Sequence, residues 1–423
     1  MTFGTNPMNP LPGFRDFYPE TLAVRRHIFD KWRDVARRYG FREYDGPPLE
    51  PLELYTQKSG DEIVGQLFNF VDKGERAVAL RPEMTPTLAR MVGPHHRDYK
   101  KPIKWFAIPQ LFRYEKQQRG RLREHFQFNA DIIGETDVSA DAELIALAID
   151  TLRSFGLTKD DFVVRVSDRL AWQRHLAATG ITGEQQYAAF QAIDKLEREP
   201  EDKTREKLAA IGLSPSQIGE ILDIARGGTV AVAPELDLVC LKLGSLFEYC
   251  QVDFKIVRGL AYYTGIVWEI HDRKGELRAI AGGGRYDNLL KQVSGVDLPA
   301  LGFGMGDVVL GELLKDRGLL PKADWGLDCY VVIADEGLRA EALKLIHQLR
   351  DEGIAVDYAF TETKVGKQFQ AASACGARYA LVIGPDEWKS GEVKLKNLAT
   401  GEERRLPAGA MELKGYIVER AIL

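Results

Sequence analysis

Cysteine is scarce in this sequence, and its few copies are scattered. None of the four belongs to a CxxC pair or to another spacing typical of metal ligands: Cys240, Cys250, Cys329 and Cys375. A chain of 423 residues with so little cysteine is typical of a reduced intracellular protein. We therefore expect neither a disulfide framework nor a zinc site.

Long apolar runs are missing as well. No stretch is long enough to cross a bilayer. Residues 1–12 are rich in Pro and Asn, without the basic start and apolar core of a secretory signal. A cytoplasmic protein without a membrane segment is therefore expected. The sequence also has no GxGxxG segment, which argues against a dinucleotide-binding Rossmann domain.

The composition is ordinary, with 45% hydrophobic and 28% charged residues. At roughly 150 residues per domain, the length predicts about three folded units. A net charge of -5 does not indicate nucleic-acid binding, although RNA contact depends on where basic residues lie rather than on their sum. Composition alone favours an enzyme acting on small molecules.

Hydrophobic periodicity predicts an amphipathic helix over 20–39, a strand over 76–80 and a helix that begins near Pro86. Residues 103–112 and 125–134 are typical of two antiparallel strands joined by a basic loop. We expect further elements downstream: a helix over 137–155, charged helices over 170–245, strands over 252–258, 262–270 and 277–281, a glycine-rich turn, and a strand leading into a helix over 301–315.

The tail alternates strands and helices, which predicts a small α/β domain with a largely parallel sheet. Its expected elements are strands at 328–333, 354–360 and 378–383, helices at 336–352 and 365–375, and a hairpin at 392–406. The predicted organisation is a catalytic core in two segments, a helical insertion, a linker and a tail domain: 1–168 and 246–316, 169–245, 317–326, and 327–423, respectively.

An arginine at a strand end comes directly before the basic loop of the hairpin. In Phe112-Arg113-Tyr114-Glu115, a guanidinium held on a strand is suited to bidentate binding of phosphate oxygens. The loop beside it suits a polyanion such as an RNA end, with its cations at Lys116, Arg119, Arg121 and Arg123. A solvated charged hairpin is the alternative, and this motif alone favours it.

Two other segments place polar side chains at strand ends. In 80–85, Glu83 and Thr85 are suited to hold an ammonium group, although Thr85 stands before a proline and the alternative role is a helix cap. In 257–265, Arg258 offers a fixed positive charge and two tyrosines offer hydroxyl groups. The alternative is tyrosine packing beside an exposed arginine.

Glycine is concentrated in two segments. Three successive glycines in Ala281-Gly282-Gly283-Gly284-Arg285-Tyr286-Asp287 let the backbone approach a ligand, the alternative being a flexible turn. Gly302-Phe303-Gly304-Met305-Gly306 leads from a strand into a helix and leaves room for a flat group above the strand end. Tight strand–helix packing is the alternative for this second segment.

The order and spacing of these segments resemble the histidine–tRNA ligases over nearly the whole chain. Three segments are similar to the motifs shared by class II aminoacyl-tRNA synthetases: helix 20–39 with Gly40-Phe41 and Pro47 to motif 1, Phe112 to Gly134 to motif 2, and Gly302 to Leu310 to motif 3. The most specific resemblance is to two peptides particular to the histidine enzymes: Arg258-Gly259-Leu260-Ala261-Tyr262-Tyr263 and Gly282-Gly283-Gly284-Arg285-Tyr286-Asp287. The tail, with Gly366-Lys367-Gln368 and Leu381-Val382-Ile383-Gly384, is similar to the family's anticodon-binding domain.

The resemblance implies an α+β catalytic domain with an antiparallel sheet, a helical insertion and a C-terminal α/β anticodon-binding domain, in a homodimer. It implies ligation of L-histidine to tRNA(His) through a histidyl adenylate, with ATP and Mg²⁺. The carboxylate of histidine is already ionised near neutral pH. Activation should therefore depend on positive charge and alignment rather than on a general base.

The resemblance also implies roles for individual residues, with Arg113 and Arg258 as the catalytic pair. The expected histidine site comprises Glu83, Met84, Thr85, Arg113, Gln127, Asp131, Arg258, Tyr262 and Tyr263. Within it, Glu83, Thr85 and Gln127 would hold the ammonium group, and Asp131 and Tyr263 the imidazole ring, although many relatives have glutamate in place of Asp131. Arg113, Arg121 and Gly304 are expected at ATP, and Lys116, Arg119, Arg121 and Arg123 at the acceptor end of tRNA.

Two positions depart from the family pattern. Ala261 stands where the family usually has an acidic residue, and Val309 where motif 3 carries an arginine over ATP. Loss of that arginine should weaken ATP binding unless another cation substitutes, and Arg285, Arg119 and Arg121 are the candidates.

These departures keep two other classes of function open. One is the non-catalytic, histidine-sensing regulatory subunit of ATP phosphoribosyltransferase, which commonly lacks the anticodon domain and tends to lose catalytic arginines. The other is a synthetase-like RNA-binding or stress-sensing module. The retained Arg113 and Arg258, together with a full tail, favour the ligase.

Overall fold

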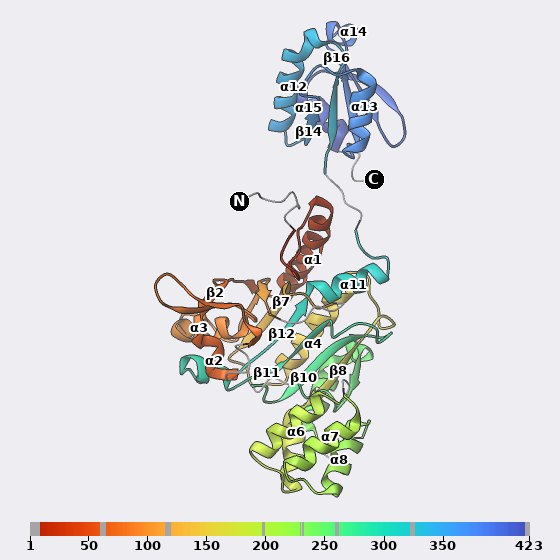
Figure 1. Cartoon of the computed structure of the whole chain (residues 1–423). Coiled ribbons are helices and arrows are strands. Elements are labelled where there is room, and N and C mark those ends of the chain that lie inside the picture. The colour runs from red at the N-terminus through yellow and green to blue at the C-terminus, as the bar shows by residue number, and fades with distance from the viewer. Residues whose placement is uncertain are drawn as a thin grey trace. The chain divides into compact units, whose positions relative to one another are not determined.

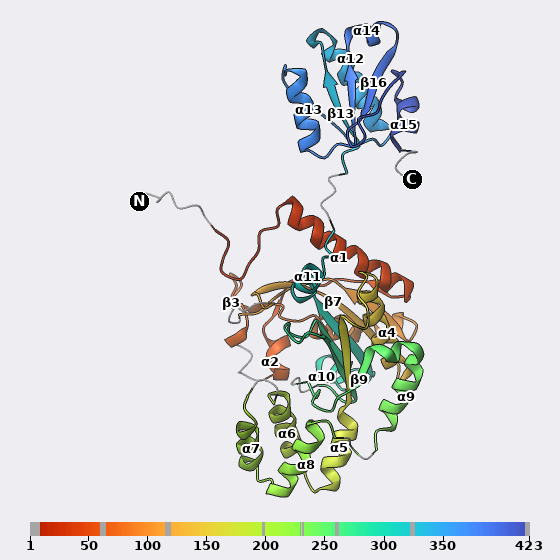
Figure 2. The same ribbon diagram turned by 90° about the vertical axis from the view of Figure 1, so that its right-hand side faces the viewer.

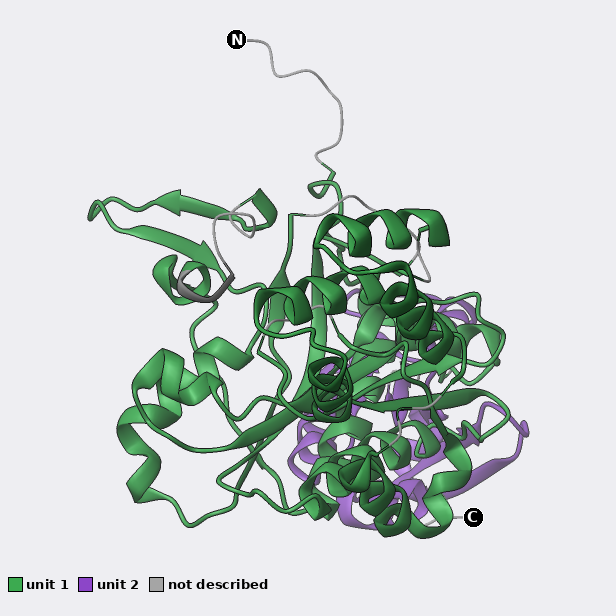
Figure 3. Cartoon of the chain, turned by 90° about the horizontal axis from the view of Figure 1, so that it is seen from below, with its two compact units in different colours: residues 1–321 green, residues 322–423 purple. Residues whose placement is uncertain are grey.

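The computed structural model of the chain describes residues 9–59, 65–114, 120–196, 199–228, 230, 232–258, 262–321 and 326–418. The chain divides into two units, residues 1–321 and 322–423, which Figure 3 colours separately. The cavity described below belongs entirely to the first unit.

The first unit is built on a sheet to which its described residues contribute nine strands, in the order β1-β5-β7-β12-β11-β10-β8-β9, with β6 also paired to β7. The sheet is antiparallel except for its two edge pairs, β1 with β5 and β8 with β9. The strands are β1 (Arg42–Glu43), β5 (Ile103–Ala107), β6 (Gln110–Phe112), β7 (Glu124–Ile133), β8 (Phe162–Asp168), β9 (Cys250–Val252), β10 (Ile266–Asp272), β11 (Ala281–Arg285) and β12 (Ala300–Gly306). This confirms the predicted antiparallel hairpin of β5–β6 and β7.

Side-chain alternation along β7 gives the sheet two different faces. Phe128, Ala130 and Ile132 belong to the main hydrophobic core, which α1 (Pro19–Arg38) and α4 (Ser139–Arg153) cover. The intervening residues Gln127, Asn129 and Asp131 are polar, so the opposite face of β7 carries hydrogen-bonding groups. Figure 1 shows these central strands with α4 along them.

Smaller elements complete this unit around the sheet. A three-stranded sheet is formed by β2 (Leu49–Pro51), β4 (Ala77–Leu80) and β3 (Asn69–Val71). The remaining helices of this part are α2 (Glu53–Ser59), α3 (Thr85–His95), α10 (Leu289–Ser294) and α11 (Asp307–Asp316), with a 3₁₀ turn, η2, at His96–Asp98.

The expected helical region follows β8. It contains α5 (Arg169–Ala178), α6 (Glu184–Asp194), α7 (Glu201–Ala210), α8 (Pro215–Ala225), α9 (Pro234–Leu243) and the 3₁₀ helix η3 (Gly244–Tyr249). Figures 1 and 2 both show α6, α7 and α8 grouped beyond one end of the sheet. Ser214 and Gln217 form a capping box that starts α8.

The second unit has a five-stranded sheet within its described residues, in the order β14-β13-β15-β16-β17. The first three strands are parallel, as predicted, and β16 and β17 form the predicted hairpin. Its strands are β13 (Cys329–Ile333), β14 (Val356–Tyr358), β15 (Tyr379–Ile383), β16 (Glu392–Asn397) and β17 (Glu403–Pro407); its helices are η4 (Glu336–Leu338), α12 (Arg339–Asp351), α13 (Val365–Ala374), α14 (Pro385–Lys389) and α15 (Ala410–Val418).

Several strand predictions between 252 and 285 were wrong. The strand β9 ends at Val252, because Asp253 turns the chain by accepting the backbone N–H of Lys255 at 3.0 Å. The strand expected at 262–270 is displaced to β10, and residues 277–280 form a loop rather than a strand.

The glycine-rich segment predicted as a turn is instead β11, a central strand of the sheet. A Cβ on Gly283 would come within 2.5 Å of the Gly302 carbonyl oxygen and of the Phe303 Cβ. The glycines are therefore required by close packing rather than by a turn.

Candidate active site

A cavity of about 510 Å³ lies on the polar face of the sheet. Its floor is formed where β7, β12, β11 and β10 lie side by side. One row crosses all four strands in register: Asn129, Gly304, Gly282 and Glu269. Because the two central members are glycines, the floor between the polar side chains has no side chains of its own.

These glycines also leave room for functional side chains. A Cβ on Gly304 would come within 2.5 Å of the Gln127 side-chain Cδ. A Cβ on Gly282 would come within 2.8 Å of Arg258 Cζ, so the Arg258 guanidinium lies directly over the strand. Side chains on the cavity side therefore leave no room for a Cβ at positions 282 and 304.

Arg258 is held over the floor by an ion pair. Its Nη1 lies 2.5 Å from Oε1 of Glu269, and Glu269 Oε2 lies 3.0 Å from Nε2 of His271. Burial alone would raise the pKa of the Glu269 carboxyl, but the charge of Arg258 and the contact with His271 lower that pKa to about 2. The residue Arg258 has a φ of 53°, a left-handed backbone conformation that is costly for a non-glycine residue.

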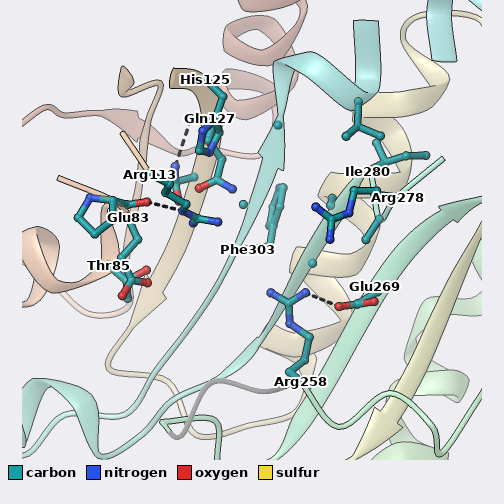
Figure 4. Close-up of a pocket in the computed structure, with 18 of the residues that line it drawn as sticks. Glu83, Thr85, Arg113, His125, Gln127, Arg258, Glu269, Arg278, Ile280 and Phe303 are labelled. Atoms are coloured by element: carbon teal, nitrogen blue, oxygen red, sulfur yellow. Dashed lines mark hydrogen bonds and ion pairs between the residues drawn. The ribbon is translucent and has the colours of Figure 1, made fainter. Parts of the chain in front are cut away.

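Arg113 approaches the cavity from the other side, directly after β6. Its Nε donates to the Pro82 carbonyl oxygen at 2.9 Å. Next to it, Glu83 Oε2 accepts the Tyr262 hydroxyl at 3.2 Å. Figure 4 shows Arg113 and Glu83 on one side of the cavity and Arg258 with Glu269 on the other.

Asp131 lies beneath the cavity surface. It is paired with Gly302 across β7 and β12, where a Cβ on Gly302 would overlap its carboxylate. The Tyr286 hydroxyl, whose side chain lines the cavity, donates to Asp131 Oδ1. Burial raises the pKa of the Asp131 carboxyl to about 7, although the hydrogen bond from Tyr286 acts in the opposite direction.

The structure brings most of the predicted site residues to this one cavity. Its lining includes Glu83, Thr85, Arg113, Arg121, Gln127, Arg258, Tyr262, Tyr263 and Gly304. The alternative of an exposed Arg258 does not hold, because this side chain is 20% exposed and ion-paired. Thr85 is the first residue of α3 rather than its cap, the cap position being Met84.

Besides Asp131, which lies beneath the surface, four predicted residues lie away from the cavity lining or outside the described part. Met84 is buried, with its sulfur 3.7 Å from Arg81 Nη1, and it does not belong to the cavity lining. Arg123 places its guanidinium 4.3 Å from the centre of the Tyr114 ring. Lys116 and Arg119 fall outside the described residues.

Sequence reasoning missed several residues that line the cavity, among them His125, Asn129, Glu269, Arg278 and Tyr286. A charged residue within the apolar strand Ile266-Val267-Trp268-Glu269-Ile270 was a signal for Glu269. Burial, with the charges of Arg113 and Arg15, lowers the pKa of His125 to about 3, so its imidazole is neutral near pH 7. The sequence gives no comparable signal for Arg278, which lies in a charged loop.

The two departures from the family pattern have different outcomes. Ala261 falls outside the described residues, whereas Val309 lines the cavity. Arg285 was a candidate to replace the missing motif 3 arginine, and this was wrong. It lies on the opposite side of β11 from Gly282 and Gly284, where it pairs with Asp141 of α4 and donates to the Glu135 carbonyl oxygen at 2.9 Å.

Among the described residues, no helix combines the length and apolar character needed to span a membrane. The same part of the chain contains no group of three or more His, Cys, Asp or Glu side chains placed to hold a metal ion.

A largely antiparallel sheet that carries a cavity with facing arginines, in a chain with a separate α/β unit, is the architecture of a class II aminoacyl-tRNA synthetase. Residues 13–306 match the family model described as histidyl-tRNA synthetase, and residues 328–417 match the model described as anticodon binding domain. The chain belongs to the histidyl-tRNA synthetase family.

Individual relatives agree with this assignment. The chain is 47% identical over 418 residues to a histidine–tRNA ligase of Opitutus terrae, covering 94% of this chain and 95% of that protein. It is 41% identical over 419 residues to a chloroplastic/mitochondrial histidine–tRNA ligase of Arabidopsis thaliana, covering 96% and 86%. The crystal structure of histidyl-tRNA synthetase from Nostoc sp. PCC 7120 superposes with a TM-score of 0.80 at 27% identity, covering 99% of this chain and all of that chain.

Proposed function

We propose that this chain ligates L-histidine to tRNA(His) and that the cavity is where histidine and ATP react. The observation that carries the proposal is the pair Arg113 and Arg258, which enter one cavity from opposite sides above a glycine-lined floor. Membership of the family supports the choice of histidine, ATP and tRNA(His) as substrates. The match of the tail to an anticodon-binding domain supports a ligase over the regulatory subunit.

In the first step, the carboxylate oxygen of histidine attacks the α-phosphorus of ATP and pyrophosphate leaves. Negative charge develops on the phosphoryl oxygens, so fixed guanidinium groups on both sides would stabilise the transition state more than the ground state. We assign this role to Arg113 and Arg258. The Pro82 carbonyl orients the first and the Glu269 carboxylate the second.

Histidine would lie with its ammonium group toward Glu83, Thr85 and Gln127, all of which line the cavity. Its imidazole would lie toward Asp131 and Tyr263. A carboxylate and a phenol offer the two ring nitrogens an acceptor and a donor–acceptor. Discrimination against analogues then follows from the polar groups that a wrong side chain would leave unpaired.

ATP would lie across the floor toward Gly304 and Arg121. We propose that it enters with Mg²⁺, whose ligands would include phosphate oxygens, as is usual for this ion. Glu269 of the lining is ion-paired with Arg258, whereas the Glu83 carboxylate, on the other side of the cavity, fits a hydrated magnesium or an ammonium group. The ion would neutralise charge on the leaving pyrophosphate.

In the second step, a ribose hydroxyl of the tRNA end attacks the adenylate carbonyl carbon and AMP leaves. The loop with Lys116, Arg119, Arg121 and Arg123 is proposed to guide that end, and residues 327–423 to bind the anticodon. We also propose residues 1–168 and 246–316 as the catalytic core, 317–326 as the linker, and 169–245 as an insertion that follows β8.

Dimerisation through motif 1 and a cytoplasmic location are further proposals. Motif 1 includes α1 and β1. The strand β1 is two residues long and lies at an edge of the large sheet. At the edge of the three-stranded sheet, β3 exposes Phe70 and Val71, and an apolar edge of this kind suits a partner surface. Light scattering of the purified chain at micromolar concentration should give twice the monomer mass.

Pyrophosphate exchange tests the proposal directly. With ATP, Mg²⁺ and histidine, the purified chain should incorporate labelled pyrophosphate into ATP, and omission of histidine should abolish the exchange. Arg258→Ala should lower the rate by roughly 100-fold, as expected for a group that stabilises transition-state charge. Histidine binding without exchange would instead support the regulatory-subunit function, and exchange without charging of tRNA(His) would exclude the full ligase.

A further inference from the structure

The cavity has an apolar residue where the family places a cation. Val309, in the first turn of α11, lines the cavity at the position of the motif 3 arginine. The valine is nearly buried, and its Cγ2 lies 3.4 Å from where a Cβ on Gly120 would stand. A polyphosphate bound near this end requires compensating positive charge from another element.

The loop before β11 is fixed beside the start of α11. The Ile280 backbone N–H donates to the Ile270 carbonyl oxygen of β10 at 2.8 Å, and the Gly306 N–H donates to the Ile280 carbonyl oxygen at 3.3 Å. Gly306 directly precedes α11. These two hydrogen bonds hold residue 280 between β10 and the start of α11, the helix that carries Val309.

Arg278 is two residues before this anchored position. Its side chain is exposed, and it lines the same cavity as Arg258 and Val309. Figure 4 shows Arg278 beside Ile280 and on the same side of the cavity as the Arg258–Glu269 pair. A guanidinium on a flexible stem at the cavity wall has the reach and the forked donors to bind phosphate oxygens.

We propose that Arg278 binds the polyphosphate of ATP and supplies the charge that Val309 does not. The inference rests on the proposed function, because it assumes that ATP occupies this cavity. Of the other candidates, Arg285 pairs with Asp141 on the far face of the sheet. Arg121, next to Gly120 in the β6–β7 loop, also lines the cavity, so the two arginines would share the phosphates.

The test is pyrophosphate exchange with purified full-length Arg278→Ala, Arg278→Lys and Lys274→Ala. Lys274 is a matched control, because it is an exposed cation of the same loop that does not belong to the cavity lining. Loss of a charge-assisted contact should raise KM for ATP by roughly tenfold in Arg278→Ala. KM for pyrophosphate should rise in parallel, while KM for histidine stays within about twofold, the range in which no contact is lost.

Arg278→Lys should recover part of the ATP affinity, since a lysine keeps the charge but not the fork. Lys274→Ala should behave as the parent chain. The inference is overturned if Arg278→Ala leaves KM for ATP unchanged in a chain that exchanges pyrophosphate. It is also overturned if only KM for tRNA rises, which would assign Arg278 to the acceptor end. A rise in KM for ATP without a rise in KM for pyrophosphate would overturn it too, because it would assign Arg278 to the adenine. Absence of exchange in the parent chain would instead refute the proposed function.

Discussion

Replacing Glu269 with glutamine should show how strongly the protein depends on an oriented Arg258. The two side chains meet at 2.5 Å and both are largely buried, with 20% and 14% of their surfaces exposed. The pKa of the Glu269 carboxyl is lowered from the ordinary 4.5 to about 2. That difference corresponds to about 3 kcal/mol of interaction in favour of the charged carboxylate.

Glu269→Gln keeps the shape and one acceptor oxygen but removes the charge. Arg258 would then be free to leave its position over Gly282, helped by its unfavourable φ of 53°. We expect kcat for histidine-dependent pyrophosphate exchange to fall by roughly 100-fold, the cost of losing one transition-state donor. KM for histidine should change by less than about threefold, because the ground state depends less on Arg258.

The pH dependence of the Glu269→Gln effect follows from the lowered pKa of the Glu269 carboxyl. Because the folded pKa is below the unfolded value of 4.5, the stabilisation by Glu269 is present above pH 4.5 and is lost as the pH falls toward 2. Between pH 6 and 9 the carboxylate stays ionised, so the ratio of parent to variant rates should be constant. Glu276→Gln removes an exposed charge from the adjacent loop and is the matched control. An exchange rate within twofold of the parent in Glu269→Gln, alongside a large loss in Arg258→Ala, would refute the reasoning.

Three further changes probe the rest of the site. Burial raises the pKa of Asp131 to about 7, so its carboxylate becomes a charged acceptor as the pH rises through 7. KM for histidine should therefore fall between pH 6 and 8 more steeply in the parent chain than in Asp131→Asn. Equal slopes would contradict this role. Gly282→Ala should lower exchange at least tenfold, since the new Cβ displaces the Arg258 guanidinium. Gly311→Ala, in open space on α11, should leave the rate unchanged. Arg285→Ala should leave the buried Asp141 carboxylate without its ion pair and lower the free energy of unfolding of the first unit in urea by roughly 3 kcal/mol. An unaltered urea midpoint would contradict a structural role for Arg285.

Arg113 and Arg258, the proposed catalytic pair, were predicted through the family resemblance because each belongs to a contiguous motif. Arg113 closes a strand before a basic loop, and Arg258 precedes paired tyrosines. Glu269 and Arg278 were not predictable in the same way. Their place at the cavity depends on the register of β10 with β11 and on the hydrogen bonds of residue 280. Both are features of the tertiary structure that local sequence does not determine.

The glycine segment shows where local rules fail. Three consecutive glycines are unfavourable in an isolated strand, so a turn was the natural prediction. In the folded chain, β11 lies between two strands whose backbones approach it closely, and Arg258 covers it from the cavity side. Neighbouring strands provide the hydrogen bonds that offset the poor propensity, and only glycine leaves room for the side chains above.

The central claim is that one cavity holds histidine and ATP between two opposed arginines. The most direct measurement is a crystal structure of the chain soaked with a non-hydrolysable histidyl-adenylate analogue. The account predicts the phosphorus-mimicking group between Arg113 and Arg258, with the imidazole directed toward Asp131 and Tyr263. Density for the analogue at another surface, or in this cavity with its phosphate mimic away from both guanidinium groups, would contradict it.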